Sequence, residues 1–471
     1  MGVPGLAPVL SKICRSSFSS SLNLKPPQEG NIRFYIDFNG LAHPSARRAW
    51  DKGMREHSEI CEFICKDTEV LVNRISPKHV IVAHDGVPPA SKILQQKKRR
   101  HLNKVTTDDW NSTNITPGTM FDKNLTEKVS QMCSEKNWFY LSSNETGEGE
   151  HKIIKFMTRK SRLGSKSVVH IIHGLDADLI ILASLSNIPN IFIMRQNQEN
   201  EEDVTYVNID EVKKTLDNVI GTEGGHRTLF YMMSLFGNDF IPTVPAFRVS
   251  DYTLRLLIDA IRTQGGCIFD GEEGILTNKV KNVLNYLVMY ENKRALGYWS
   301  DNISNEFLKT RVKKSGNSWR SQYHAYMFSG GDESKSYPVT VDPLMVLELS
   351  CDYWIGMNFV WSYYTQKEID NTWYYKWVHA PSIQCLLYMI SGTDFEMSIL
   401  SKKSLLTQER KSQMLNEKEL LNVVLNEETQ KLLGVTKTEQ RYSWANALLG
   451  KLKKTIDLTG RDHERICIFE T

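Results

Sequence analysis

Short apolar runs recur along the first half of the chain, and each of the clearest ends close to an acidic side chain. These runs cover residues 32–36, 80–83 and 168–173. They are rich in β-branched residues and nearly continuous, which is typical of strands in a parallel sheet covered on both faces. Stretches with helical periodicity separate them, at about 46–75 and about 120–136. This alternation predicts an α/β fold whose central, mostly parallel sheet is flanked by helices.

The pattern changes near residue 250, after which a mainly helical region is predicted. Apolar residues recur at helical spacing in 251–264 and 278–292. The Ser-, Gly- and Lys-rich stretch 309–340 is typical of a linker or mobile loop, and an aromatic-dense segment follows at 351–381. Aromatic side chains of this kind are more often core than a platform for nucleobases. The predicted organisation is a first domain over 1–250, a helical region over 251–395 and a helical C-terminal extension over 396–471.

Composition narrows the possible functions without choosing one. The 471 residues include 41% hydrophobic and 24% charged residues, with a net charge of +3, which are ordinary values for a globular protein. So small a net charge does not by itself indicate nucleic-acid binding. No apolar run is long enough for a membrane span, and the eight cysteines lack a disulfide or zinc spacing. We expect an intracellular protein of the cytoplasm, with the nucleus as the alternative.

Seven acidic side chains stand at or just beyond the ends of predicted strands and helices. Open α/β sheets place their sites at the carboxyl ends of strands, so these side chains are expected to converge. Converged carboxylates cannot all remain ionised unless cations neutralise them. Oxygen ligands suit Mg²⁺ or Mn²⁺, and no His/Cys cluster competes for zinc. The candidate metal ligands and catalytic residues are Asp37, Asp85, Glu148, Glu150, Asp176, Asp178 and Asp239.

A basic helix after Asp85 offers a place for a phosphate near these acids. Pro88 and Pro89 can open a helix, on which four side chains share one face at about 100° per residue. Because no acidic residue occurs between Asp85 and Asp108, the natural counter-charge of that face is a phosphate. The alternative is an ordinary solvated basic helix. The four side chains are Lys92, Gln96, Arg99 and Arg100.

These same segments resemble the 5′→3′ exoribonuclease family of the XRN type. The matching stretches are, in chain order, MGVPGL, YIDFNGLAHP, HDGVPPASKILQQKKRR, NITPGT, GEGEHKI, HGLDADLIIL and FGNDFIP. A weaker match runs through WIGMNFVWSYY and WYYKWVHAP, so the ordered matches reach about residue 390. The resemblance implies the PIN-like, flap-nuclease-like form of the α/β fold.

The resemblance also implies roles for residues. The seven acids match the family's metal-site residues, and the four side chains of the basic helix match its pocket for the 5′-monophosphate of RNA. His43 matches a histidine that stacks on the 5′ nucleotide. For the stacking tryptophan, the register places Phe359 at the family position, with Trp361 two residues on as the candidate.

The implied activity is processive hydrolysis of single-stranded, 5′-monophosphorylated RNA to nucleoside 5′-monophosphates. It would use two Mg²⁺ ions about 4 Å apart, for which Mn²⁺ could substitute, to activate a water and stabilise the leaving oxygen. The C-terminal modules of longer relatives have no evident counterpart here. We therefore expect a compact member, of a kind that a reduced or viral genome could encode, with no protein partner indicated.

Two other functions fit part of this pattern. A structure-specific DNA nuclease of the flap-endonuclease type shares the early MG…GL and the Asp-rich site, but usually has a GIG turn after its last Asp. Here Asp239 is followed by FIPTVPAFRVS, which lacks those glycines. A non-catalytic RNA-binding scaffold would be expected to have lost carboxylates, whereas all seven positions are acidic.

Overall fold

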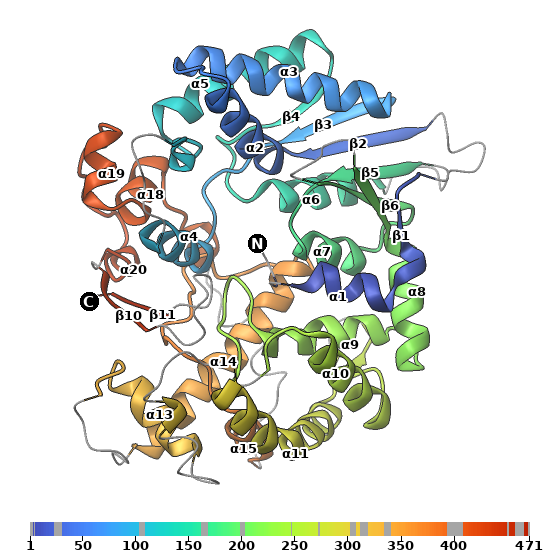
Figure 1. Cartoon of the computed structure of the whole chain (residues 1–471), viewed down its shortest axis with the longest axis vertical. Coiled ribbons are helices and arrows are strands. Elements are labelled where there is room, and N and C mark those ends of the chain that lie inside the picture. The colour runs from blue at the N-terminus through green and yellow to red at the C-terminus, as the bar shows by residue number, and fades with distance from the viewer. Residues whose placement is uncertain are drawn as a thin grey trace.

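A seven-stranded sheet forms the centre of the N-terminal half in the computed structural model (Figure 1). Its strand order is β1-β7-β6-β5-β2-β3-β4. The five strands from β6 to β4 run parallel, whereas β7 is antiparallel to β6 and β1 to β7. The predicted mostly parallel sheet is therefore confirmed. The strands are β1 (Phe18–Ser19), β2 (Ile32–Asp37), β3 (His79–Ala83), β4 (Phe139–Leu141), β5 (Val169–His173), β6 (Ile191–Gln196) and β7 (Val204–Asn208).

The structure describes most, but not all, of the chain. The described residues are 3, 5–22, 31–102, 109–161, 168–197, 203–245, 247–271, 274–301, 308–310, 319–333, 341–392, 408–449, 452–456 and 466–469.

Helices cover both faces of the sheet. Because side chains alternate along a strand, Phe34 and Val82 join one hydrophobic cluster, with α2, α3 and α5, and Tyr35 and Ile81 join another, with α6 and α7. Figure 1 shows these two sets of helices on opposite sides of the strands. The helices of this half are α1 (Leu6–Ile13), α2 (Phe38–Asp51), α3 (His57–Ile75), α4 (Ala90–Leu102), α5 (Met120–Glu135), α6 (Gly149–Ser161), α7 (Asp178–Leu185), α8 (Ile209–Ile220) and α9 (Gly225–Met232).

The single helix predicted over 46–75 is instead two helices. α2 starts earlier, at Phe38, and ends at Asp51, and α3 begins at His57 and packs against it. The chain turns at Gly53, whose φ of 89° lies in the left-handed region that glycine adopts readily. The polar residues of this turn fit the polar face of a helix, so the hydrophobic pattern alone did not reveal the break.

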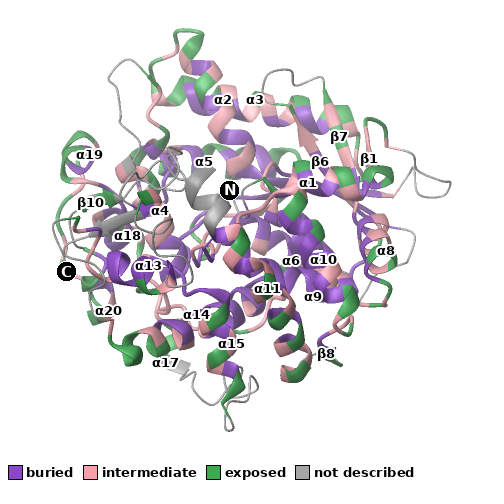
Figure 2. Ribbon diagram, turned by 60° about the horizontal axis from the view of Figure 1, so that its bottom comes forward, coloured by how far each residue is buried: buried purple, intermediate pink, exposed green. Residues whose placement is uncertain are grey.

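The second half is mainly helical, as predicted. Its helices are α10 (Asp251–Thr263), α11 (Thr277–Asp301), α13 (Trp319–Phe328), α14 (Pro343–Tyr364) and α15 (Ile383–Ser391), with a short strand pair, β8 (Phe269–Asp270) and β9 (Gly274–Ile275). Much of α14 is buried (Figure 2). The linker predicted over 309–340 is wrong for α13, because Trp319 and Tyr326 are buried in the core. Most of the rest of that stretch lies outside the described residues.

The C-terminal segment packs on the basic helix. Leu420 and Leu421 of α18 belong to one hydrophobic cluster with Val87 and Ile93, and Figure 1 shows α18 beside α4. Besides the predicted helices, this segment contains an antiparallel strand pair. Its elements are α17 (Gln408–Ser412), α18 (Glu417–Val424), α19 (Glu427–Leu432), α20 (Ser443–Asn446), β10 (Leu452–Ile456) and β11 (Ile466–Phe469). Among the described helices, none is both long and apolar enough to cross a bilayer.

Candidate active site

Three carboxylates lie at one edge of the sheet because three neighbouring strands end there. Asp37 is the last residue of β2, Asp85 follows shortly after β3, and Asp176 follows shortly after β5. β2 pairs in parallel with both β3 and β5, so the carboxyl ends of all three strands meet. The predicted placement of these acids at strand ends is found in the fold.

α6 approaches this edge so closely that its first residue must be small. The Gly149 amide donates a 2.6 Å hydrogen bond to Oδ1 of Asp85. A Cβ on Gly149 would lie 2.8 Å from the Ala83 carbonyl oxygen and 3.1 Å from Oδ1 of Asp37. Glycine at this position therefore allows the two flanking glutamates, Glu148 and Glu150, to reach the strand ends.

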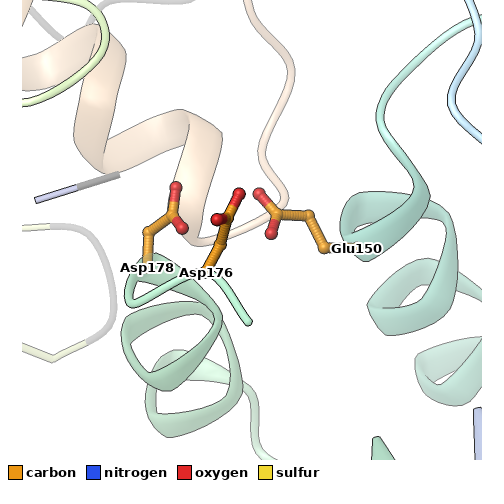
Figure 3. A group of neighbouring side chains, drawn as sticks. All are labelled: Glu150, Asp176 and Asp178. Atoms are coloured by element: carbon orange, nitrogen blue, oxygen red, sulfur yellow. The ribbon is translucent and has the colours of Figure 1, made fainter. Parts of the chain in front are cut away.

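Glu150, Asp176 and Asp178 form the tightest acidic group (Figure 3). One carboxylate oxygen from each lies within 4.8 Å of the others, a spacing that could hold a metal ion. Oδ1 of Asp178 is buried and has no hydrogen-bond partner among the described residues. A buried oxygen without a donor fits a cation, and an all-carboxylate set favours Mg²⁺ or Mn²⁺ over metals that prefer nitrogen or sulfur.

The acids perturb one another electrostatically. Burial raises the pKa of Asp37 well above its usual value, and three neighbouring carboxylates raise it further: Asp85, Glu148 and Asp176. Burial and then Asp178 and Glu148 raise the pKa of Glu150. Burial raises the pKa of Asp178 to about 6, and Asp239 contributes to that shift. All seven predicted acids are thus linked in one cluster, which needs added positive charge to ionise fully.

Lys92 of α4 brings positive charge to this cluster. Its Nζ lies 2.9 Å from Oε1 of Glu148 and 2.7 Å from Oδ2 of Asp239. Burial alone would lower the pKa of Lys92, but the two carboxylates hold it well above its usual value. This corrects one expectation. The basic face has no acidic partner within its own segment, yet its first member has two in the folded chain.

A tight turn brings Asp239 to Lys92. Gly237 has a φ of 79°, and a Cβ there would overlap neighbouring backbone, so glycine is required. Oδ1 of Asn238 then accepts hydrogen bonds from the amides of Phe240 and Ile241, at 2.9 and 3.1 Å. These bonds fix the loop that follows the short 3-10 helix η4 (Met233–Phe236).

The two arginines of α4 form a second group, together with His43 of α2. Arg100 donates a 2.9 Å hydrogen bond to Oγ1 of Thr116 and a 3.4 Å hydrogen bond to Oε1 of Gln96. Burial, and then the charges of Arg99 and Arg100, lower the pKa of His43 to about 4. The predicted pocket residues therefore divide: the lysine pairs with the acids, whereas Arg100 contacts Gln96 and Thr116.

Trp361, the predicted stacking residue, packs against other aromatic rings. Its buried ring stacks on Phe269, with centroids 4.7 Å apart and an interplanar angle of 18°, and meets the Tyr231 ring edge-on. Phe359, the other candidate, is also buried and stacks on Trp373 with centroids 4.4 Å apart. Both rings are part of the hydrophobic core, so their positions argue against stacking on a base.

Two tyrosines of α14 belong to the site and were not predicted. Tyr363 donates a hydrogen bond to Oε2 of Glu148. The Tyr364 hydroxyl is buried without a hydrogen-bond partner in the described structure, and burial, followed by Asp178 and Asp239, holds its pKa well above the usual value. The aromatic density of 351–381 was the only sequence signal for them, and it does not tell which rings face the acids.

The fold and the site define an α/β protein with a carboxylate cluster suited to divalent cations and a basic helix beside it. Residues 1–109 and 101–197 match the family described as the XRN 5′-3′ exonuclease N-terminus. The chain is 25% identical over 354 residues to 5′-3′ exoribonuclease 2 of Yarrowia lipolytica, covering 55% of this chain and 35% of that protein. It is also 25% identical over 348 residues to 5′-3′ exoribonuclease 1 of Saccharomyces cerevisiae, covering 61% of this chain and 22% of that one. Over its first 197 residues the chain is therefore similar to the N-terminal region of the XRN-type family.

The aligned parts cover about a third or less of these longer relatives. One of them is 5′-3′ exoribonuclease 2 of Gibberella zeae, which is 29% identical over 217 residues. That alignment covers 36% of this chain and 22% of the relative. Among solved structures, the flap endonuclease of bacteriophage T5 aligns with 61% of this chain and 98% of its own. The TM-score is 0.33 at 10% identity, which carries no argument about function.

Proposed function

We propose that this chain is a 5′→3′ exoribonuclease that hydrolyses single-stranded RNA from a 5′-monophosphorylated end and releases nucleoside 5′-monophosphates. One observation carries the proposal. Along the single helix α4, Lys92 contacts the carboxylate cluster, and Arg99 and Arg100 follow about two turns later, where their charges act on His43. A candidate hydrolytic centre and a candidate phosphate pocket are therefore held in fixed register. Similarity to the XRN-type family supports RNA as the substrate and the 5′→3′ direction.

The carboxylate cluster would hold the metal. Two Mg²⁺ ions, or Mn²⁺ in their place, supply an activated water and charge stabilisation at the scissile phosphate when bound. Glu150, Asp176 and Asp178 are the best-placed ligands by distance. Lys92 balances charge at Glu148 and Asp239 from the side of α4. In the net reaction a water oxygen bonds to phosphorus, the bond from phosphorus to the 3′ oxygen breaks, and that oxygen takes up a proton.

The arginine group would select the 5′ end. Arginine forks pair with phosphate through two hydrogen bonds, and a hydroxyl end would leave them without a counter-charge. Arg100 is already oriented by its hydrogen bond to Thr116, so little ordering is required on binding. His43, whose low pKa keeps it neutral, can stack on the first base without adding charge.

The test compares one RNA body carrying three different 5′ ends, namely monophosphate, hydroxyl and cap, with a flap DNA. Each is incubated with the full chain and Mg²⁺, Mn²⁺ or EDTA. We expect metal-dependent release of mononucleotides from the monophosphate RNA alone. Cleavage of the flap DNA instead would assign the chain to the structure-specific DNA nucleases. Binding of RNA without any cleavage would identify a scaffold and overturn the proposal.

A further inference from the structure

A groove lined in part by Glu148 is not used by the function proposed above. It has a volume of about 590 Å³ and runs between α6 and the end of α14. Glu148 and Tyr363, which share a hydrogen bond, are both in its wall. The groove therefore adjoins the candidate hydrolytic centre at Glu148.

The charge of the groove wall is positive. Four cationic side chains line it against two acidic ones, Glu145 and Glu148. Lys152 is buried, and its Nζ donates to the backbone carbonyls of His84 and Ser142, so two of its three N–H donors are already used. Lys155 and Arg159 differ from Lys152. They lie one turn apart on α6 and are exposed, and neither makes an ion pair or hydrogen bond to another described residue.

The groove also contains an unsatisfied donor. The amide nitrogen of Gln366 lies 2.7 Å from Nδ1 of His151. An amide NH₂ can only donate, so Nδ1 accepts and the neutral imidazole carries its hydrogen on Nε2. That Nε2 is buried and has no partner among the described residues. The side chain of His151 is thus held in one orientation against Gln366 at the wall of the groove.

The rest of the wall mixes polar residues with apolar ones, among them Phe156, Leu141, Ile369 and Met414. We propose that this groove binds a nucleotide phosphate next to the acid cluster, with Lys155 and Arg159 on the phosphate and the apolar wall beside the base. The phosphate could come from a released nucleoside 5′-monophosphate or from the RNA backbone. The choice of a nucleotide as ligand rests on the proposed function, whereas the preference for an anion rests on the positive charge of the groove wall alone.

The test is direct binding of AMP to the full chain in EDTA, where no turnover can occur, with adenosine as the probe without phosphate. The variant carries Lys155→Ala and Arg159→Ala together. The matched control carries Lys12→Ala and Lys214→Ala, two exposed lysines on α1 and α8 that do not line the groove. We expect the Kd for AMP to rise about tenfold or more in the groove variant, because two charge-assisted contacts are lost. The Kd for AMP should not change in the control variant, and the Kd for adenosine should not change in the groove variant.

A 5′-hydroxyl RNA distinguishes the two sources of phosphate. If the Kd values for this RNA and for AMP both rise in the groove variant, the groove holds RNA backbone. If only the Kd for AMP rises, the groove holds the released product. An Arg99→Ala variant is measured in parallel. A rise in its Kd for AMP shows that AMP also binds at the candidate phosphate pocket of Arg99 and Arg100. Unchanged binding of both ligands in the groove variant would overturn the inference. If the wild-type chain cleaves no RNA but its AMP binding still depends on Lys155 and Arg159, the proposed function fails and the groove site stands.

Discussion

The phenol of Tyr363 donates a hydrogen bond to the carboxylate of Glu148, although the two residues are 215 positions apart in the chain. The other oxygen of Glu148 is paired with Lys92 at 2.9 Å. A carboxylate held by one donor on each oxygen has a fixed orientation. α14, from the second half of the chain, therefore helps to position an acid of the first half.

Replacing Tyr363 with Phe should separate positioning from packing. The variant keeps the ring and loses one hydrogen bond to a charged group, worth about 1.5–3 kcal/mol. We expect kcat on monophosphate RNA to fall about tenfold or more with little change in KM or in melting temperature. Tyr388→Phe, at an exposed ring on α15, is the control. A change in melting temperature without a change in kcat would show that Tyr363 is only structural.

Asp178→Asn tests the carboxylate cluster. Asn keeps the size of the side chain but removes the charge that a divalent ion needs. If the bound ion contributes about 4 kcal/mol, turnover should fall about a thousandfold, as it should when EDTA removes the metal. RNA binding in EDTA should stay within about twofold of wild type. Full turnover in this variant would exclude Asp178 as a ligand.

Arg100→Ala should weaken the choice between 5′ ends. Losing a charge-assisted contact of about 2 kcal/mol predicts a roughly thirtyfold smaller preference for monophosphate over hydroxyl RNA, measured as the ratio of kcat/KM values. Arg255→Ala is the control, because among the described residues Arg255 pairs only with Asp251, at an exposed position on the same helix. An unchanged ratio would place the phosphate pocket elsewhere.

Gly149→Ala tests the close approach of α6 to the sheet. The new methyl would lie 2.8 Å from the Ala83 carbonyl oxygen, so α6 must shift away from the strand ends. We expect a loss of about 1–3 kcal/mol in the free energy of unfolding and a larger fractional loss of activity, since both neighbouring glutamates move. Gly392→Ala is the control, because a Cβ there would meet nothing closer than 3.7 Å.

Trp361→Leu distinguishes a core residue from a base-stacking one. Leu keeps the position apolar but cannot fill the space against Phe269, so stability should fall by about 1–3 kcal/mol in urea unfolding. The Kd for RNA should remain within about twofold, whereas His43→Ala should weaken it by about 1–3 kcal/mol if that ring stacks on a base. A large loss of RNA affinity in the Trp361 variant at unchanged stability would restore its predicted role.

The positions of the acids were predictable because they depend on local pattern and on one topological rule. Short apolar runs identified β2, β3 and β5, and parallel strands have their carboxyl ends at one edge. Asp37, Asp85 and Asp176 follow from these two facts. The arginine face of α4 followed in the same way from helical spacing.

Contacts between distant segments were not predictable from such patterns. Lys92 is 147 positions from Asp239, and nothing in either segment encodes that pairing. The burial of Trp361 depends on Phe269 and Tyr231, which belong to other elements. Aromatic density showed that this segment would be well packed, but not which ring would face the site and which would face the core.

The packing of α18 on α4 sets an order of assembly. Val87 and Ile93 lie beneath Leu420 and Leu421, so a growing polypeptide that has not yet extended past residue 400 leaves that side of α4 in water. We expect the arginine group to become rigid only when the last part of the chain is made, and limited proteolysis of a 1–400 fragment should then cut within α4. A chain built in this way completes the surroundings of its arginine group last.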